Sequence, residues 1–283
     1  MKVLITGGHG QLAQAFFRFL QNRGHDVFAP GREELDITSW PALKEAFLSF
    51  RPQMVINAAA YNLVDQAETD FEQALRVNAW AVTQLSSLCR KHQAFLMHFS
   101  TDYVFDGEKG RPYTEEDRPS PLNRYGLSKW LGEMAVRDLA PQYLLFRVSW
   151  LYGTGKQNFL AKLQAWARER EVLKLAYDEF SVPTYVETVV KMAWEAYEAG
   201  LGGLFHLVNR GFASRLEWGK AFLELMGLRR EVIPVSGKSF DLPAKRPFFS
   251  AMSPKALEKA LGIELPLWHE DLKRFVTSLK KNP

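Results

Sequence analysis

A tyrosine and a lysine four residues apart form the first candidate catalytic pair. The run Tyr125-Gly126-Leu127-Ser128-Lys129 places both side chains on one face of a helix, if this stretch is helical. Reduction of a ketone by hydride produces an alkoxide that needs a proton, and a free tyrosine with a pKa of about 10 donates one reluctantly near neutrality. A nearby ammonium favours the phenolate and makes Tyr125 a better proton relay, and Lys129 can also hold ribose hydroxyls. Because this spacing also occurs by chance, other residues must support it.

Two further groups of residues follow predicted strands. Ser100-Thr101-Asp102-Tyr103 comes at the end of one strand, where the carboxyl end of a parallel strand opens into a ligand crevice. The Thr101 hydroxyl could bond a substrate carbonyl and stabilise its developing negative charge. Asn57-Ala58-Ala59-Ala60-Tyr61-Asn62 ends another strand at the same edge of the sheet. Its small residues leave room for a flat ligand, although helix packing would also explain them.

A glycine-rich turn follows the first predicted strand. The run Gly7-Gly8-His9-Gly10-Gln11-Leu12-Ala13 has the pattern G-x-x-G-x-x-A and leads into a predicted helix. The glycines permit a tight turn against a pyrophosphate, the helix N-terminus faces its negative charge, and Ala13 allows close packing of helix on strand. We therefore expect a dinucleotide to bind here, in contact with Gly7, Gly10, Gln11 and Leu12.

The end of the second predicted strand favours a phosphorylated cofactor. NAD-binding proteins of this type carry an acid at that point, which bonds the ribose hydroxyls. This sequence reads Val27-Phe28-Ala29-Pro30-Gly31-Arg32, with no carboxylate at the strand end and a cation just beyond it. Arg32 would accommodate a 2′-phosphate, so the sequence favours NADP(H) while NAD(H) stays open. An arginine in a solvated turn is the alternative interpretation.

The elements that must position these residues alternate between short apolar runs and longer amphipathic stretches. The runs are nearly all apolar, as expected for parallel strands that are covered by helices on both faces. The predicted strands are Lys2–Thr6, Val27–Ala29, Met54–Asn57, Phe95–Ser100 and Tyr143–Val148. This order predicts an α/β fold with a Rossmann-type doubly wound parallel sheet.

The later sequence predicts a second, smaller unit. Helices are predicted over Gln11–Arg23 and Thr184–Ala199, and the second of these leads into a further strand of the same sheet at Leu204–Val208. The dinucleotide-binding domain is therefore expected to comprise 1–151 plus about 183–208. The rest, about 152–182 plus 209–283, is richer in proline and turn residues and has short helices at Glu217–Met226 and Pro254–Leu261. We expect it to form a smaller C-terminal α/β substrate domain.

Composition limits the functional classes. The chain has 283 residues, 47% hydrophobic and 24% charged, which is typical of a globular protein. Its 36 basic residues are scattered among 32 acidic ones, so a nucleic-acid partner is not expected. Cys89 is the only cysteine, and the six histidines show no metal-ligand spacing, so no metal is expected. No signal peptide and no apolar run of about 18 residues occur, which predicts a cytoplasmic protein without membrane contact.

Together these motifs resemble the extended short-chain dehydrogenases and, among them, the dTDP-4-dehydrorhamnose reductases. The resemblance covers almost the whole chain, and its motifs occur in the family's order. Besides the glycine turn and the Tyr125 and Lys129 pair, they are Leu35-Asp36-Ile37-Thr38, Asn57-Ala58-Ala59-Ala60, Val64-Asp65-Gln66-Ala67-Glu68, 100–107 and 147–153. The resemblance implies NAD(P)H-dependent reduction of the C4 ketone of a nucleotide sugar, dTDP-4-dehydro-L-rhamnose, to dTDP-L-rhamnose, and a possible homodimer.

The resemblance also implies roles for individual residues. Tyr125, Lys129 and Thr101 would be catalytic. The cofactor would additionally meet Asp36 and Ile37 on its adenine side, and Ala58, Ala60 and Tyr61. The substrate would meet Asn62, Val64, Thr101, Asp102, Tyr103, Trp150 and Arg246. Arg246 is the candidate partner of the substrate diphosphate, and a plain surface charge is an equal alternative for it.

Three departures from the family pattern occur, of which the first is tolerated by this class of turn and the two later ones leave the exact sugar nucleotide open. Ala13 replaces a glycine, Ser181-Val182 replace Gly-Ala before Pro183, and Phe249 replaces an asparagine near the C-terminus. Two other functions also stay open. One is a sugar-nucleotide epimerase or dehydratase that keeps its cofactor bound. The other is a catalytically silent NADP-binding regulatory subunit, because the beta subunit of methionine adenosyltransferase resembles the same reductases.

Overall fold

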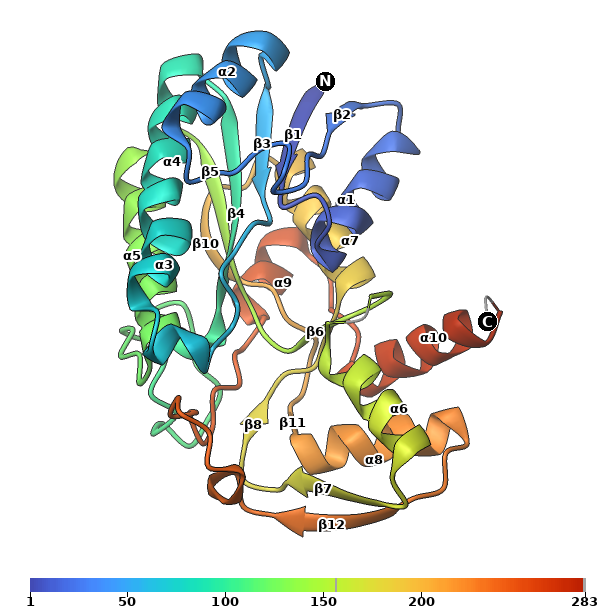
Figure 1. Ribbon diagram of the computed structural model, residues 1–283. Coiled ribbons are helices and arrows are strands. Elements are labelled where there is room, and N and C mark those ends of the chain that lie inside the picture. Colours follow the sequence, from blue (N-terminus) through green and yellow to red (C-terminus); the bar gives the residue numbers. More distant parts are fainter. Residues whose placement is uncertain (156, 282–283) are drawn as a thin grey trace.

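A six-stranded parallel sheet forms the centre of the computed structural model, which describes residues 1–155 and 157–281 (Figure 1). Its strand order is β10-β5-β4-β3-β1-β2. The strands are β1 (Lys2–Thr6), β2 (Asp26–Phe28), β3 (Met54–Asn57), β4 (Phe95–Thr101), β5 (Tyr143–Val148) and β10 (Gly203–His206). The predicted return of the chain to the sheet is therefore confirmed, since β10 pairs with β5.

Helices cover both faces of this sheet (Figure 1). One face carries α1 (Gln11–Gln21) and α7 (Val186–Glu198). The other carries α2 (Trp40–Phe50), α3 (Phe71–Leu75), the π-helical turn η2 (Arg76–Trp80), α4 (Ala81–His92) and α5 (Arg124–Leu139). Because successive side chains of a strand point to opposite faces, Val3 and Ile5 of β1 pack with α1 and α7, whereas Leu4 packs with α2 and α4. The predicted Rossmann-type doubly wound fold is confirmed.

The predicted helix boundaries differ from the structure by one or two residues, and two of the differences have a clear structural reason. Helix α1 ends at Gln21, because the Gly24 N–H bonds to the Gln21 carbonyl and Gly24 takes a φ of +74°, which ends the helical path. The helix predicted from Thr184 begins only at Val186. The two preceding residues form β9 (Thr184–Tyr185), which pairs with β6 (Leu151–Tyr152), a tertiary contact that local periodicity does not reveal.

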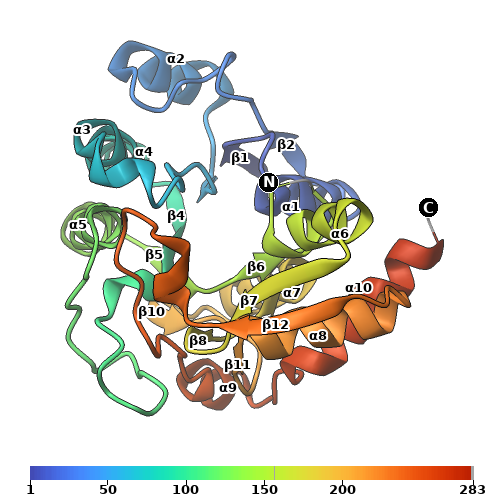
Figure 2. The ribbon, with the colours of Figure 1, turned by 60° about the horizontal axis from the view of Figure 1, so that its bottom comes forward.

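A second group of elements lies beyond the carboxyl ends of the sheet (Figure 1, Figure 2). Parallel β7 (Val172–Ala176) and β12 (Glu231–Val235) pack with α6 (Phe159–Glu169), α8 (Arg215–Met226) and α10 (Trp268–Lys281). Its core contains Leu163, Trp218, Phe222 and Phe275. The short pair β8 (Phe180–Ser181) and β11 (Ala213–Ser214) and the 3₁₀ turns η1 (Gln66–Glu68), η3 (Asp102–Val104) and η4 (Gly237–Phe240) complete the structure with α9.

Helix α9 (Lys255–Leu261) packs on the large sheet, away from the core of the second group. Leu257 and Leu265 are buried in the same core as Val3 and Phe16. The expected assignment of all of 209–283 to a substrate domain therefore needs revision. We propose that the segment around α9 belongs with the dinucleotide-binding unit. No helix in the described part of the chain is long and apolar enough to cross a membrane.

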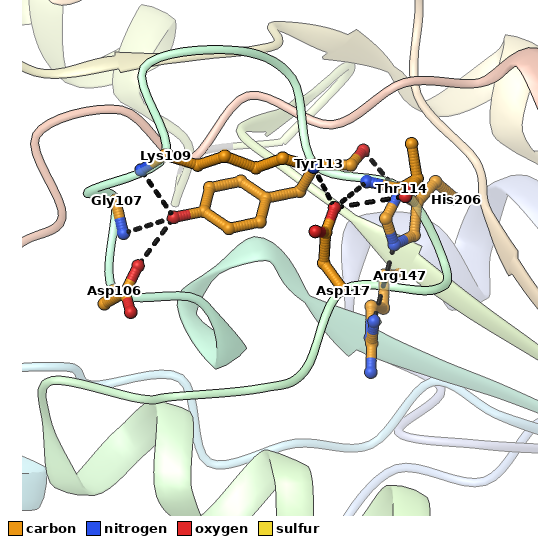
Figure 3. Close-up of polar contacts among 8 residues, drawn as sticks. All are labelled: Asp106, Gly107, Lys109, Tyr113, Thr114, Asp117, Arg147 and His206. Carbon is orange, nitrogen blue, oxygen red and sulfur yellow. Dashed lines mark hydrogen bonds and ion pairs between the residues drawn. The ribbon is translucent and has the colours of Figure 1, made fainter.

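Buried polar groups hold the long loop between η3 and α5 against the sheet (Figure 3). The Tyr113 hydroxyl donates to Asp106 at 2.6 Å and accepts from the Gly107 N–H at 3.0 Å. The Tyr113 carbonyl lies 3.2 Å from Nδ1 of His206, and Nε2 of His206 lies 3.4 Å from the Arg147 guanidinium. These neighbours assign the proton of a neutral His206 to Nδ1. Burial, with the adjacent Arg147 cation, lowers the pKa of His206 to about 3.

We expect His206 to make stability fall in mild acid. The unfolded histidine has a pKa of about 6.5, so between that pH and about 3 the unfolded chain binds a proton that the folded chain does not. Lowering the pH from 7.5 to 5 should therefore remove about 2 kcal/mol of the free energy of unfolding through this residue. Urea denaturation at the two pH values measures the loss. His206→Asn should reduce the pH dependence by about that amount and the exposed His269→Asn should not; equal pH dependence in both would contradict the assignment.

Candidate active site

A cavity of about 630 Å³ lies between the carboxyl ends of the sheet strands and the second group of elements. Parallel strands present their carboxyl ends at one edge, which is where ligands bind in such folds. The structure brings nine residues predicted as site residues into the wall of this cavity: Gln11, Asn62, Val64, Thr101, Asp102, Tyr103, Tyr125, Trp150 and Arg246.

Tyr125 enters the cavity from the first turn of α5. Asn123 caps this helix, and its side chain accepts from the Gly126 N–H at 2.8 Å. A Cβ atom on Gly126 would lie 2.1 Å from the Tyr103 carbonyl oxygen, so only glycine lets α5 pack this closely on η3. This close packing places Tyr125 beside Thr101 in the wall of the cavity. The predicted juxtaposition of these two residues is therefore present.

The pKa of Tyr125 shifts in the direction opposite to the one expected from a nearby lysine ammonium. Burial raises the pKa of Tyr125 above its ordinary value, and the contact with Thr101 offsets only part of that rise. The expected shift toward phenolate is therefore wrong for this arrangement, because removing the phenol from water disfavours its charged form. At neutral pH the phenol holds its proton and can donate it to an alkoxide.

Lys129 lies one turn further along α5, behind the cavity wall. It is 2% exposed, and its ammonium donates to the Phe99 carbonyl of β4 at 2.6 Å. Burial lowers the pKa of Lys129 to about 8, while the nearby Glu133 carboxylate raises it. Lys129 is thus held by the sheet at the strand end beside Thr101, with its charge partly preserved by Glu133.

The Asp102 carboxylate is hydrogen-bonded to protein groups, whereas a contact with the substrate was predicted for it. Its carboxylate accepts from three hydroxyls: Thr101 at 3.1 Å, Ser181 at 2.8 Å and Ser250 at 2.5 Å. Ser181 and Ser250 come from the second group of elements and from the segment after η4, so this carboxylate joins separate parts of the chain. Burial raises the pKa of Asp102, and the three hydroxyls oppose that rise. One departure from the family pattern, Ser181, therefore has a defined structural partner.

The glycine turn fits a dinucleotide pyrophosphate. Gly7 has a φ of +70°, and a Cβ atom on it would lie 2.8 Å from the Ala59 Cα. Gly10 precedes α1, and no side chain caps this helix, so its first N–H groups can meet an anion. Gly7 thus lets the turn pack closely on the end of β3, and the uncapped N–H groups of α1 supply donors where a phosphate is expected, so the residues present fit the cofactor.

Two predicted cofactor contacts have buried side chains. Leu12 packs in the core below α1, and Ile37 packs with Leu4 and Leu43 on the opposite face of the sheet. Only their backbones could meet a ligand, because amphipathic periodicity directs these apolar side chains inward. Asp36 accepts from the Thr38 N–H at 2.9 Å and hydroxyl at 2.8 Å, and it lies 3.8 Å from the exposed Arg32.

The strand-end segment with Ala58, Ala60 and Tyr61 is held by a residue that the sequence did not single out. The Asn78 side chain accepts from the Tyr61 N–H and donates to the Tyr61 carbonyl, both at 2.9 Å. It also donates to the Ser128 hydroxyl at 2.9 Å, beside Lys129 on α5. Ala60 is exposed, and Ala58 and Tyr61 are half-buried, so all three remain open to a ligand.

The predicted diphosphate ligand, Arg246, is already paired in the structure. It makes two hydrogen bonds to the Asp65 carboxylate, at 2.7 and 3.1 Å. A second guanidinium, that of Arg215, lines the same cavity and lies 3.6 Å over the ring of Trp150. Sequence reasoning missed Arg215, since it belongs to no recognised motif. Only the packing of α8, whose Trp218 stacks on Trp150, brings Arg215 to that ring.

The fold and the site define a class of protein. A doubly wound parallel sheet, a glycine turn at its first strand and a ligand cavity at its carboxyl edge are features of the Rossmann-type dinucleotide-binding proteins. The UDP-glucose 4-epimerase of Thermus thermophilus, crystallised with NAD, shares this fold with a TM-score of 0.84. It is 22% identical and covers all of both chains, and this likeness concerns the fold alone.

Residues 1–281 match the family model of the RmlD substrate binding domain, and the chain belongs to this family. It is similar to a dTDP-4-dehydrorhamnose reductase of Burkholderia thailandensis, 35% identical with 95% of each chain covered. It also resembles a crystal structure of the dTDP-4-dehydrorhamnose reductase of Bacillus anthracis in complex with NADP. That structure has a TM-score of 0.95 and is 33% identical over 98% of this chain and 99% of the other. The resemblance expected from the motifs is therefore confirmed.

Proposed function

We propose that this protein is an NADPH-dependent reductase that converts the C4 ketone of dTDP-4-dehydro-L-rhamnose into the alcohol of dTDP-L-rhamnose. The observation that carries this proposal is the position of Tyr125, a half-buried phenol that keeps its proton at neutral pH, beside Thr101 in the wall of the ligand cavity. The reductases of the same family and the NADP complex of the Bacillus anthracis protein support the choice of substrate and cofactor.

Different residues of the chain would bind the cofactor and supply the proton. Gly7 and Gly10 and the first N–H groups of α1 would hold the cofactor pyrophosphate, and Lys129 the ribose hydroxyls. Bound NADPH would supply the hydride that reaches C4. Tyr125 gives its proton to the ketone oxygen, so that one hydride and one proton complete the alcohol.

The predicted bond from Thr101 to the ketone is not part of this proposal, because the Thr101 hydroxyl is used within the protein. Its single hydroxyl proton is donated to Asp102 at 3.1 Å, and its oxygen also accepts from the Tyr103 N–H at 3.2 Å. A proton used in this way cannot bond the substrate carbonyl at the same time. Asp102 therefore orients the Thr101 hydroxyl, which lies beside Tyr125 in the cavity wall.

The test of the proposed function is oxidation of NADPH, and separately of NADH, followed by absorbance with freshly generated dTDP-4-dehydro-L-rhamnose. We expect rapid oxidation that requires the sugar nucleotide and is faster with NADPH. Absence of oxidation by a protein that still binds NADPH would contradict the proposed activity. An oxidised nucleotide that copurifies tightly with the protein would favour an epimerase instead.

We expect Arg32→Ser to weaken the preference for NADPH. Arg32 is 71% exposed beside Asp36, and its guanidinium would meet the 2′-phosphate. Loss of one charge-assisted contact should lower kcat/KM with NADPH about 10-fold and leave the value with NADH nearly unchanged. Arg137→Ser, at the far end of α5, is the matched control. If the two cofactors respond equally, Arg32 does not read the phosphate.

The proposal includes the smaller substrate domain, with the α9 segment excluded from it, and a cytoplasmic homodimer. Light scattering after gel filtration measures the oligomeric state directly.

A further inference from the structure

Arg215 is a cation of the cavity wall without a polar partner. It is the first residue of α8, and its guanidinium lies flat over Trp150 at 3.6 Å and 5.0 Å from the centre of the Phe159 ring. Within residues 1–155 and 157–281, its side chain makes no hydrogen bond, and no carboxylate oxygen comes within 4.0 Å of it. Arg215 is half-buried, and a cation that has lost part of its water without a partner carries a desolvation cost, so a ligand that compensates its charge would bind there favourably.

The other cations of the cavity are placed differently. Arg246 is neutralised by Asp65, with which it makes two hydrogen bonds. Lys162 and Lys174 are exposed and keep their water. The backbone of Glu179 meets that of Arg215, since the Glu179 carbonyl accepts the Arg215 N–H at 3.2 Å. Among the described residues, however, the Glu179 carboxylate forms no ion pair with the Arg215 guanidinium. Among the described residues, Arg215 is therefore the cation of the cavity wall that is neither paired with a carboxylate nor fully exposed to water.

A guanidinium that stacks on an indole ring is held in position and can still bind an anion through its N–H groups. A guanidinium whose face covers an aromatic ring keeps its N–H donors free in its own plane, where they can meet two oxygens at once. Trp150 itself is held in place, because its ring stacks on Trp218 at 5.5 Å and its backbone adopts a φ of +40°. The position of Arg215 is thus set before any ligand arrives.

We propose that Arg215 binds the diphosphate of the sugar nucleotide and that Trp150 fixes its orientation. The inference rests on the proposed function for the substrate class. A diphosphate is favoured over the cofactor 2′-phosphate because Arg32 and the second strand end do not line this cavity, whereas Tyr125 does. Arg246, paired with Asp65, closes the cavity wall instead of meeting the diphosphate.

Calorimetric binding of dTDP and of thymidine tests this assignment without turnover. Arg215→Gln should weaken dTDP binding at least about 10-fold and leave thymidine binding unchanged, because only the diphosphate loses a charge-assisted contact. The dTDP affinity of Arg215→Lys, which keeps the charge and loses the planar guanidinium, should lie between those of the wild-type protein and Arg215→Gln. Arg23→Gln is the matched control, since Arg23 lies over Phe19 at the same 3.6 Å but in the exposed turn that follows α1.

Several results would overturn the proposal. These are wild-type dTDP affinity in both Arg215 variants, equal weakening of dTDP and thymidine, or no binding of dTDP by the wild-type protein. A protein that binds dTDP through Arg215 but reduces no ketone would contradict the proposed function alone. One that reduces dTDP-4-dehydro-L-rhamnose with unchanged KM in both Arg215 variants would contradict the role of Arg215 alone.

Discussion

Replacing Tyr125 by phenylalanine lowers kcat for ketone reduction at least about 100-fold, the usual contribution of a positioned proton donor. The substitution removes one oxygen atom from the cavity wall and leaves the ring, which packs edge-to-face against Tyr103 at 6.0 Å. Binding of NADPH should persist because the glycine turn is untouched. Steady-state oxidation of NADPH and direct titration of the cofactor measure the two quantities.

The control for this variant is Tyr197→Phe. Tyr197 lies on α7, outside the cavity, and its hydroxyl meets only the sulfur of Met1 at 3.8 Å among described residues. Its loss should leave kcat within about twofold, since no proton transfer depends on it. If Tyr125→Phe retained wild-type turnover, Tyr125 would not be the proton donor and the proposed mechanism would be wrong.

Arg147→Met should destabilise the protein by about 3–5 kcal/mol, because it leaves a buried carboxylate without its cation. Arg147 on β5 and Glu133 on α5 are each 1% exposed and form two hydrogen bonds, at 2.7 and 2.9 Å. Glu133 also lies close enough to raise the pKa of Lys129, so its charge connects this ion pair to the catalytic helix. The free energy of unfolding in urea measures the loss.

Two further variants separate the ion pair from simple packing. The double variant Arg147→Met with Glu133→Leu should recover most of the lost stability, since neither charge of this pair then stays buried. Arg18→Met breaks the exposed pair with Glu187, whose side chains are 50% and 44% exposed, and should cost less than about 1 kcal/mol. A single Arg147→Met variant as mild as Arg18→Met would contradict the importance of the buried pair.

Local sequence was sufficient to predict the sheet, the glycine turn and the proximity of Tyr125 and Lys129. Each depends on neighbours within a few residues: apolar runs make buried strands, Gly7 permits a positive φ, and a four-residue spacing makes one helical turn. The family motifs added Thr101 and Trp150 to the cavity wall, where the structure has them.

The tertiary structure decided the charge states and the long-range partners. The pKa of Tyr125 rises and that of Lys129 falls because the packed domain removes water from both, and burial is invisible in a spacing. The pairing of Arg246 with Asp65, the hydroxyls of Ser181 and Ser250 on Asp102, and the stacking of Arg215 on Trp150 join residues far apart in the chain. The sequence by itself thus determined the fold and the chemical groups of the site. Only the packing of the sheet unit against the second group of elements decided which side chains of the site are already paired within the protein and which can still bind a ligand. This pairing depends on long-range contacts, which no local pattern encodes.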